Sequence, residues 1–219
     1  ARHLSLGGRY ISALARPDRW KTWRYDAVRR GLGLVRRHQP AVLWSTYPIA
    51  TAHVIGAELQ RRTGLPWIAD FRDPMAQDGY PTDPLTWRQF ADIEAAAARQ
   101  ASLLAFTTPS ALRDYQARYP QAAAKMVVLE NGYDEPSFAN AERRLGTATP
   151  LNPGRTTLLH SGIVYPSERD PTQLIEALAL LKAQGAGARL VVRFRAAVHD
   201  ELLRTLAAQH GVAEMVEIL

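Results

Sequence analysis

The stretch PWIADFRDPM, residues 66–75, joins a short buried-strand pattern to a strongly polar end. Its first four residues are apolar, and Asp70, Arg72 and Asp73 follow almost at once. In an open parallel sheet, polar residues at a strand's carboxyl end lie on the edge where ligands bind. Two hypotheses stay open. The three charged side chains line a ligand site, or Arg72 forms an internal salt bridge with one of the two carboxylates.

Strand patterns and helix patterns alternate along the chain on both sides of this stretch. Short apolar runs predict strands, and apolar residues at helical spacing predict helices. We expect strands at 41–46 (buried), 66–70, 102–107, 126–130, 156–161, 189–194 and 215–219, and helices at 17–38, 49–63, 85–100, 109–119, 171–184 and 200–210. This alternation is typical of parallel βαβ units, so the predicted fold class is α/β with Rossmann-like parallel sheets.

One segment interrupts the alternation of strands and helices and divides the chain. Residues 139–155 contain two prolines, two glycines and no clear period, which indicates a linker. We expect a first Rossmann-like domain at 1–140 without its opening strand, a linker at 141–155, and a second, incomplete domain at 156–219. The chain therefore has the pattern of a protein clipped at both ends.

Polar residues also follow the other predicted strands. Tyr47, Thr108, Asn131 and His160 stand at or just beyond strand ends, so we expect them along the same rim as Asp70. Hydroxyl, amide, guanidinium and carboxylate groups together offer both donors and acceptors, which suits a polyhydroxylated ligand such as a sugar.

The first turn of the second domain has features of a phosphate site. Gly162, after Ser161, allows a backbone to approach a ligand closely. Asp170 and Pro171 indicate a helix start, whose free N–H groups attract a diphosphate, and Arg169 adds a cation beside it. The carboxylate of Asp170 would compete for the same N–H groups. An ordinary capped helix after a tight turn is the alternative.

The ordered segments GLPWIADFRDP, NGYDE and HSG…RDP resemble the retaining glycosyltransferases of family 4, over about residues 40–219. The resemblance implies a GT-B architecture, in which two Rossmann-like domains face each other across a cleft. It implies that the first domain binds the acceptor, a glycan or a lipid-linked sugar, and the second binds a nucleotide-sugar donor.

Roles for individual residues also follow from the resemblance. It implies that the Asp73 region, with Arg72 and Asp70, lies near the reacting sugar, and that Ser161, Gly162 and Arg169 face the donor diphosphate. The family usually has Gly-Arg in that first turn and Lys-Gly slightly later. Here Ile163 follows the glycine and Arg169-Asp170 stands where Lys-Gly would be, so the chain does not match the family's pattern at one of its cationic contacts.

The mechanism that the resemblance implies requires no protein nucleophile, no metal and no cofactor, because the nucleotide-sugar is a co-substrate. The family also has a glutamate pair, E-x7-E, later in its second domain, and Glu214 and Glu217 have neither that spacing nor that position. We therefore expect the 219-residue chain to be inactive by itself. A non-catalytic nucleotide- or sugar-binding module is the alternative.

The positive charge of the chain is concentrated at one end. Residues 1–40 hold ten Lys or Arg and two Asp, a balance of +8, and the remainder holds 17 against 19, or −2. Trp20 and Trp23 lie among these cations, so the expected helix either turns a tryptophan stripe to the core, which we favour, or lies on an anionic membrane. No nucleic-acid motif accompanies the charge.

The cysteine content, the length of the apolar runs and the spacing of the histidines narrow the class of protein. The chain has no cysteine, and it has no apolar run of the roughly 18 residues that a membrane span needs, so we expect a cytoplasmic protein, with peripheral membrane contact as an open alternative. His53 is expected to be packed or hydrogen-bonded within its helix, and the other histidines have no metal-ligand spacing.

Overall fold

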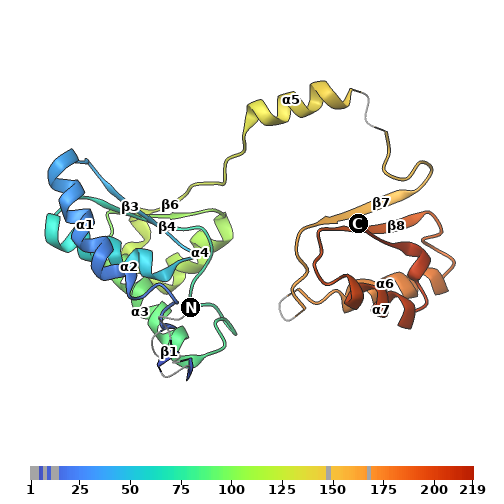
Figure 1. Ribbon diagram of the computed structural model, residues 1–219, viewed down its shortest axis with the longest axis horizontal. Coiled ribbons are helices and arrows are strands. Elements are labelled where there is room, and N and C mark those ends of the chain that lie inside the picture. Colours follow the sequence, from blue (N-terminus) through green and yellow to red (C-terminus); the bar gives the residue numbers. More distant parts are fainter. Residues whose placement is uncertain (1–4, 7–8, 11–14, 147–148, 167–168) are drawn as a thin grey trace. The chain divides into compact units, whose positions relative to one another are not determined.

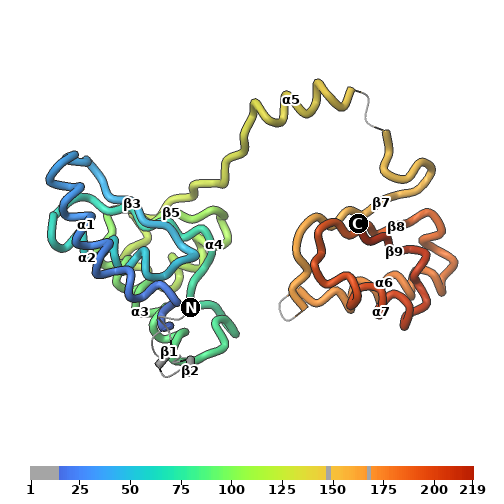
Figure 2. The backbone as a smooth tube through the Cα atoms, viewed as in Figure 1, coloured from blue at the N-terminus to red at the C-terminus, as the bar shows by residue number. Residues whose placement is uncertain are grey.

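The computed structural model describes residues 5–6, 9–10, 15–146, 149–166 and 169–219 (Figures 1 and 2). The chain divides into two compact units, Ala1–Tyr133 and Asp134–Leu219. Each unit contains its own parallel sheet and its own hydrophobic core. The fold is therefore α/β with two parallel-sheet units, of which the second has the smaller sheet.

The first unit begins with a minimal antiparallel pair and continues as alternating helices and strands. Its elements are β1 (Ser5–Leu6), β2 (Arg9–Tyr10), α1 (Trp23–His38), β3 (Leu43–Thr46), α2 (Ala50–Thr63), β4 (Trp67–Phe71), α3 (Pro84–Gln100), β5 (Leu103–Phe106), α4 (Pro109–Arg118), the 3-10 helix η3 (Pro120–Lys125) and β6 (Met126–Val128).

The strands of this sheet follow each other in chain order, β3-β4-β5-β6, and all pair in parallel. Crossovers between parallel strands are right-handed, so successive crossovers in one direction put α2, α3 and α4 on the same face. The core lies between that face and the helices. Burial along β4 alternates accordingly. Trp67, Ala69 and Phe71 are buried, whereas the residues between them are only half-buried.

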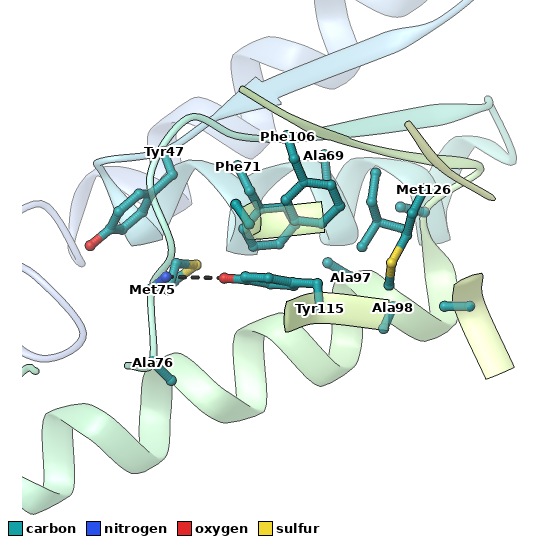
Figure 3. Packing of buried hydrophobic residues seen from close by; sticks show 14 of the residues in the cluster. Tyr47, Ala69, Phe71, Met75, Ala76, Ala97, Ala98, Phe106, Tyr115 and Met126 are labelled. Carbon is teal, nitrogen blue, oxygen red and sulfur yellow. Dashed lines mark hydrogen bonds between the residues drawn. The ribbon is translucent and has the colours of Figure 1, made fainter. Parts of the chain in front are cut away.

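Aromatic rings form the centre of this core (Figure 3). The ring centroid of Phe71 lies 5.6 Å from that of Phe106 and 5.1 Å from that of Tyr115. The Tyr115 hydroxyl accepts a hydrogen bond from the backbone N–H of Met75, at 3.0 Å. The core therefore extends beyond the sheet and includes the start of the loop that follows β4.

The predicted burial of the strand at 41–46 is wrong. β3 is an edge strand, and Trp44 is 51% exposed, since strand order places no neighbour on its outer side. The predicted core-facing tryptophan stripe is also wrong, because Trp20 and Trp23 are 41% and 48% exposed. The reason is that α1 packs mainly on α2 and not on the sheet. The two helices are in close contact at Gly31, where a Cβ atom would lie only 2.9 Å from the Leu59 side chain. The helix also begins at Trp23 rather than at residue 17.

The second unit contains α5 (Glu135–Leu145), β7 (Thr156–Ser161), α6 (Thr172–Ala183), β8 (Leu190–Arg195), α7 (Asp200–Gln209), the 3-10 helix η4 (Ala213–Met215) and β9 (Val216–Ile218). The sheet order is β7-β8-β9, again parallel and in chain order. α6 and α7 lie on one face (Figure 1) and enclose Ile175, Phe194 and Leu203. On β7, Leu158 and Leu159 remain about half exposed.

A helix occupies part of the segment that we predicted to lack regular structure. α5 ends at Leu145, so the prediction for 139–155 is wrong in its first seven residues. None of its residues is buried. Phe138, Ala141 and Leu145 recur at helical spacing within α5, and the prolines and glycines of residues 146–155 obscured this signal when the segment was taken as a whole. Among the described residues, no helix combines the length and the apolar character that crossing a membrane requires.

Candidate functional site

A cavity of about 480 Å³ lies at the carboxyl ends of three neighbouring strands of the first unit. Asp70 is the fourth residue of β4, Arg72 follows that strand, and Thr107 follows β5. The segment after β6 supplies the opposite wall, with Leu129, Glu130, Asn131 and Gly132. The structure thus brings Asp70, Arg72 and Asn131 together, although 59 residues separate Arg72 from Asn131 in the sequence.

Backbone hydrogen bonds fix this rim to the sheet. The N–H of Tyr47 donates to the carbonyl of Asp70 at 3.0 Å, and the N–H of Leu129 donates to the carbonyl of Phe106 at 2.7 Å. The Thr107 hydroxyl donates to the carbonyl of Arg72 at 2.8 Å. The backbone that carries Asp70, Arg72 and Leu129 is therefore fixed by the sheet.

The internal salt bridge that the sequence left open does not form. Within the described ranges, no ion pair or hydrogen bond joins Arg72 to Asp70 or Asp73. Arg72 is exposed and Asp70 is half-buried. The cavity consequently offers a guanidinium, two carboxylates, a hydroxyl and an amide that can hydrogen-bond a ligand.

Three residues predicted for the rim have other positions. Asp73 is exposed next to Arg72 but does not line the cavity. Tyr47 is wrong as a rim side chain, because it is buried with its ring nearly perpendicular to that of Phe90, at 5.9 Å between ring centroids. This burial raises the pKa of its phenol. Thr108 caps α4 by accepting from the N–H of Ala111, so its neighbour Thr107 lines the cavity instead.

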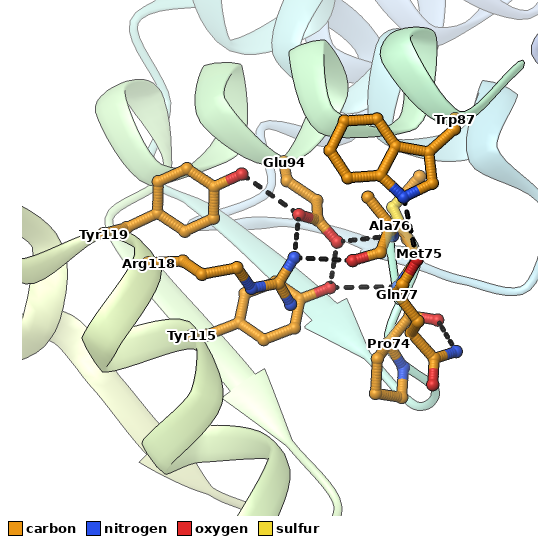
Figure 4. A network of polar contacts seen from close by, with 9 residues as sticks. All are labelled: Pro74, Met75, Ala76, Gln77, Trp87, Glu94, Tyr115, Arg118 and Tyr119. Atoms are coloured by element: carbon orange, nitrogen blue, oxygen red, sulfur yellow. Dashed lines mark hydrogen bonds and ion pairs between the residues drawn. The ribbon is translucent and has the colours of Figure 1, made fainter. Parts of the chain in front are cut away.

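A buried carboxylate, which the sequence analysis missed, holds the loop after β4 in place (Figure 4). Glu94 of α3 is fully buried and accepts hydrogen bonds from the Ala76 N–H at 2.9 Å and the Tyr119 hydroxyl at 3.0 Å. It also accepts from the Tyr115 hydroxyl and from Arg118, the latter at 2.8 Å. The sequence did contain a signal of this burial, because Glu94 lies at helical spacing from the buried Phe90, Ala97 and Ala98 of α3.

In the second unit, β7 ends at Ser161, which is exposed, and Gly162 has a φ of 143° that favours glycine. The backbone groups of Gly162 are both occupied. Its N–H donates to the carbonyl of Arg195 at 3.0 Å, and its carbonyl lies 3.1 Å from Nε2 of His160. No atom of the described residues lies within 4 Å of a Cβ placed on Gly162, apart from its chain neighbours, so this side of the turn is open.

The start of α6 differs slightly from the prediction. The helix begins at Thr172, one residue later than expected, and Asp170 accepts from both the N–H and the hydroxyl of Thr172, at 3.0 and 2.6 Å. These bonds hold the pKa of Asp170 below its usual value. Asp170 therefore occupies an N–H group that a diphosphate would use. The exposed guanidinium of Arg169 lies 5.6 Å from the Tyr165 ring centroid, and no described carboxylate pairs with it.

Together these features define an α/β protein with polar groups at the carboxyl edge of each parallel sheet. Residues 2–132 match the family model described as a glycosyl transferase 4-like domain, and the chain belongs to this family. The resemblance to family 4 glycosyltransferases is thus confirmed. No curated protein matches the chain.

Solved structures with the same fold include a HepE protein from Anabaena in complex with UDP, with 17% identity and a TM-score of 0.56 over 88% of this chain and 50% of that one. Sucrose-phosphate synthase from Thermosynechococcus elongatus has 13% identity and a TM-score of 0.58, over 91% and 50%. UDP-GlcNAc 2-epimerase from Neisseria meningitidis, bound to UDP-GlcNAc, has 9% identity and a TM-score of 0.56, over 90% of this chain and 52% of that one.

At these identities the similarity shows the fold, the Rossmann-like GT-B type, and the chain spans about half the length of these structures. Across the described ranges, no three His, Asp or Glu side chains gather closely enough to hold a metal ion.

Proposed function

We propose that the full-length protein transfers a sugar from a nucleotide-sugar donor to an acceptor with retention of configuration. The observation that carries this proposal is the cavity at the carboxyl ends of β4, β5 and β6, in a chain that belongs to the glycosyl transferase 4-like family. Asp70, Arg72 and Asn131 line it, and their side chains form no hydrogen bond or ion pair with any described residue, which leaves them available for sugar hydroxyls.

In this proposal the first unit acts on the reacting sugar. Asp70 and Asn131 bind sugar hydroxyls, and Arg72 donates to an oxygen of the substrate. The exposed carboxylate of Asp73, the residue after Arg72, favours the cation-like character that the sugar gains as the glycosidic bond breaks. A retaining transfer of this kind needs no covalent intermediate on the protein.

The donor diphosphate is assigned to Ser161, Gly162 and Arg169 of the second unit, with His160 beside the turn. The open space beside Gly162 and the exposed guanidinium of Arg169, which pairs with no carboxylate among the described residues, support this assignment. Because Asp170 and Arg195 already use the N–H groups of Thr172 and Gly162, Arg169 supplies most of the charge stabilisation. Two structures of the HepE protein hold UDP and UDP-glucose, which supports a nucleotide-sugar as the donor.

Replacing Arg169 with alanine in the full-length protein is expected to lower kcat of sugar transfer at least tenfold, because the leaving diphosphate loses its cation as charge develops. Arg189, an exposed arginine elsewhere in the second unit, provides the matched control, and Arg189→Ala should transfer at the wild-type rate. An unchanged kcat in Arg169→Ala would remove the leaving-group role.

A non-catalytic nucleotide- or sugar-binding module is the second candidate. The observation in its favour is that two of the N–H groups predicted for the diphosphate are occupied within the chain. Full-length protein that binds a nucleotide-sugar but transfers no sugar would select this candidate. The 219-residue chain spans about half of the similar structures, so we expect it to show no transfer by itself.

We further propose that the first unit contacts an anionic membrane, where a lipid-linked acceptor would be available. Trp20, Trp23 and Ile49 form an exposed apolar hollow with Thr22. The guanidinium of Arg19 lies 5.1 Å from the Trp20 ring centroid. Exposed tryptophans flanked by cations are typical of peptides that lie in the membrane interface.

The 219-residue chain is expected to sediment with vesicles containing phosphatidylserine at low salt and to be released at high salt. Replacing both Trp20 and Trp23 with serine should abolish the binding, because these side chains supply the apolar contact. Trp44→Ser, at another exposed tryptophan, should leave it unchanged. Sedimentation that is absent at low salt, or equal in wild type and the double variant, would contradict the proposal.

A further inference from the structure

Two parallel strands of the second unit end side by side at its carboxyl edge. β7 ends at Ser161 and β8 ends at Arg195, and the register of the ladder places these two residues opposite each other. Neighbouring strands lie about 4.8 Å apart, so Arg195 stands beside the turn to which the donor diphosphate is assigned. The sugar transfer proposed above gives the Arg195 side chain no role.

Backbone hydrogen bonds join the segments that follow these two strands. The N–H of Gly162 donates to the carbonyl of Arg195, and the N–H of Val164 donates to the carbonyl of Ala197, both at 3.0 Å. Ala197 is fully buried and anchors its segment in the core of the second unit. The backbone of Arg195 is therefore fixed relative to the turn at Gly162.

The side chain of Arg195 points away from the helices. Side chains alternate between the two faces of a strand, and the preceding residue, Phe194, is buried in the core that α6 and α7 cover. Arg195 therefore lies on the opposite face, which it shares with Ser161, and both residues are exposed. A ligand at the Ser161 hydroxyl would thus be within reach of the Arg195 guanidinium.

The charge of Arg195 is not neutralised within the described part of the chain. Two residues earlier on the same face, Arg193 pairs with Glu217 of β9 at 2.6 Å, because the register places these two residues opposite each other. β9 ends at Ile218, and the next residue, Leu219, has no charged side chain. No described carboxylate pairs with Arg195, so its guanidinium is available for an anion, whereas that of Arg193 is not.

The turn after Arg195 has an unusual backbone. Ala196 and Val198 have φ values of 57° and 71°, in the left-handed region that residues other than glycine rarely adopt, and the branched side chain of Val198 makes this conformation costly. Val198 is also 67% exposed, so burial of its side chain does not offset the cost. Backbone strain of this kind is concentrated at ligand sites, where it fixes a binding geometry. The turn is therefore a second, independent indication of a site beside Arg195.

We propose that Arg195 is a further diphosphate-binding residue, whose guanidinium donates two hydrogen bonds to phosphate oxygens held at the Ser161–Gly162 turn. This inference rests on the proposed binding of the donor diphosphate at that turn. A guanidinium matches phosphate oxygens in a bidentate manner, and such charge-assisted bonds are stronger than neutral ones. Arg195 adds a second cation to that of Arg169, and the two together match the two negative charges of a nucleotide-sugar diphosphate.

Isothermal titration calorimetry of the full-length protein with UDP, GDP, ADP and dTDP tests this proposal, with the diphosphate that binds most tightly as the probe. Arg195→Gln should weaken binding of the probe at least tenfold, because a bidentate, charge-assisted contact is lost. Arg189→Gln is the matched control and should leave the affinity unchanged. Arg189 is an exposed residue at the amino end of β8, about 20 Å from Arg195 at roughly 3.3 Å per residue.

Two further measurements separate a phosphate contact from a loss of fold. Without ligand, thermal unfolding of Arg195→Gln should match that of wild type, because the side chain is exposed. Arg195→Lys keeps the charge but not the bidentate geometry, so it should lose less affinity than Arg195→Gln.

The outcomes distinguish this inference from the proposed donor site. If wild type binds a diphosphate and Arg169→Ala weakens it while Arg195→Gln does not, the inference is wrong and the donor site stands. Equal weakening by Arg195→Gln and Arg189→Gln would show a general effect of charge and would also overturn the inference. If wild type binds none of the four diphosphates, the proposed donor site is wrong and the inference fails with it.

Discussion

Replacing Glu94 with alanine is expected to lower the free energy of unfolding of the first unit by about 3 to 5 kcal/mol, because breaking a buried ion pair leaves the other charge without a partner. The Glu94 carboxylate is fully buried and accepts from the Ala76 N–H, the Tyr119 hydroxyl and Arg118. Alanine would leave the buried Ala76 N–H without an acceptor and Arg118, whose side chain is 34% exposed, without its counter-charge.

Urea unfolding followed by tryptophan fluorescence measures this effect in the first unit alone, because all five tryptophans lie between residues 20 and 87. Asp26→Ala is the control. Asp26 pairs with Arg29 and Arg30 on the surface of α1, where ion pairs contribute little. Glu94→Gln keeps the shape but not the charge and should fall between the two. If Glu94→Ala unfolds at the same urea concentration as Asp26→Ala, the network does not stabilise the unit.

Lowering the pH from 7 to 5 is expected to cost the first unit about 2 kcal/mol through His53, at about 1.36 kcal/mol for each pH unit below the unfolded pKa. Burial holds the pKa of the folded histidine at about 4, against 6.5 when unfolded. Between these values the unfolded chain binds the proton and the folded chain does not. Stability is therefore fully present above pH 6.5 and is lost as the pH falls toward 4.

Urea unfolding at pH 7, 6 and 5, compared between wild type and His53→Gln, isolates this contribution. Glu58 and Asp83 have pKa values of about 2 in the folded chain. Their contributions to stability are lost only as the pH falls from about 4, which is below the range from pH 7 to 5 measured here. The difference between wild type and His53→Gln should shrink steadily toward pH 5. A constant difference across the three pH values would show that His53 does not resist protonation.

Element positions could be predicted from the sequence because local signals mark them. The helix expected at 85–100 is α3, Pro84–Gln100, where Asp83 caps the start and accepts from the Thr86 N–H. The helix expected at 49–63 is α2, which ends at Gly64 in the left-handed conformation. The parallel sheets then follow from the alternation of these elements.

Burial could not be predicted in the same way, because it depends on which element packs against which. Trp20, Trp23 and Trp44 are large and apolar, yet all three are exposed, since α1 packs mainly on α2 and β3 is an edge strand. Tyr47 follows a strand end but turns into the core against Phe90. No property of these residues alone distinguishes a rim position from a core position.

The candidate site shows the same division. Asp70, Arg72 and Asn131 converge because parallel strands share a carboxyl edge, which the sequence pattern indicates. The choice between Thr107 and Thr108 depends on a helix cap, and Glu94 acts through residues on α4 and in a loop. Such contacts join segments that are distant in the sequence, so they become visible only in the structure.

The central claim is that the carboxyl edge of β4, β5 and β6 binds the sugar that is transferred. Transfer from a panel of nucleotide-sugars by the full-length protein, compared with Arg72→Ala, Asn131→Ala and the surface control Arg88→Ala, tests it most directly. We predict that kcat/KM falls at least tenfold in the first two variants and is unchanged in Arg88→Ala. Wild-type kcat/KM in both Arg72→Ala and Asn131→Ala would contradict the account.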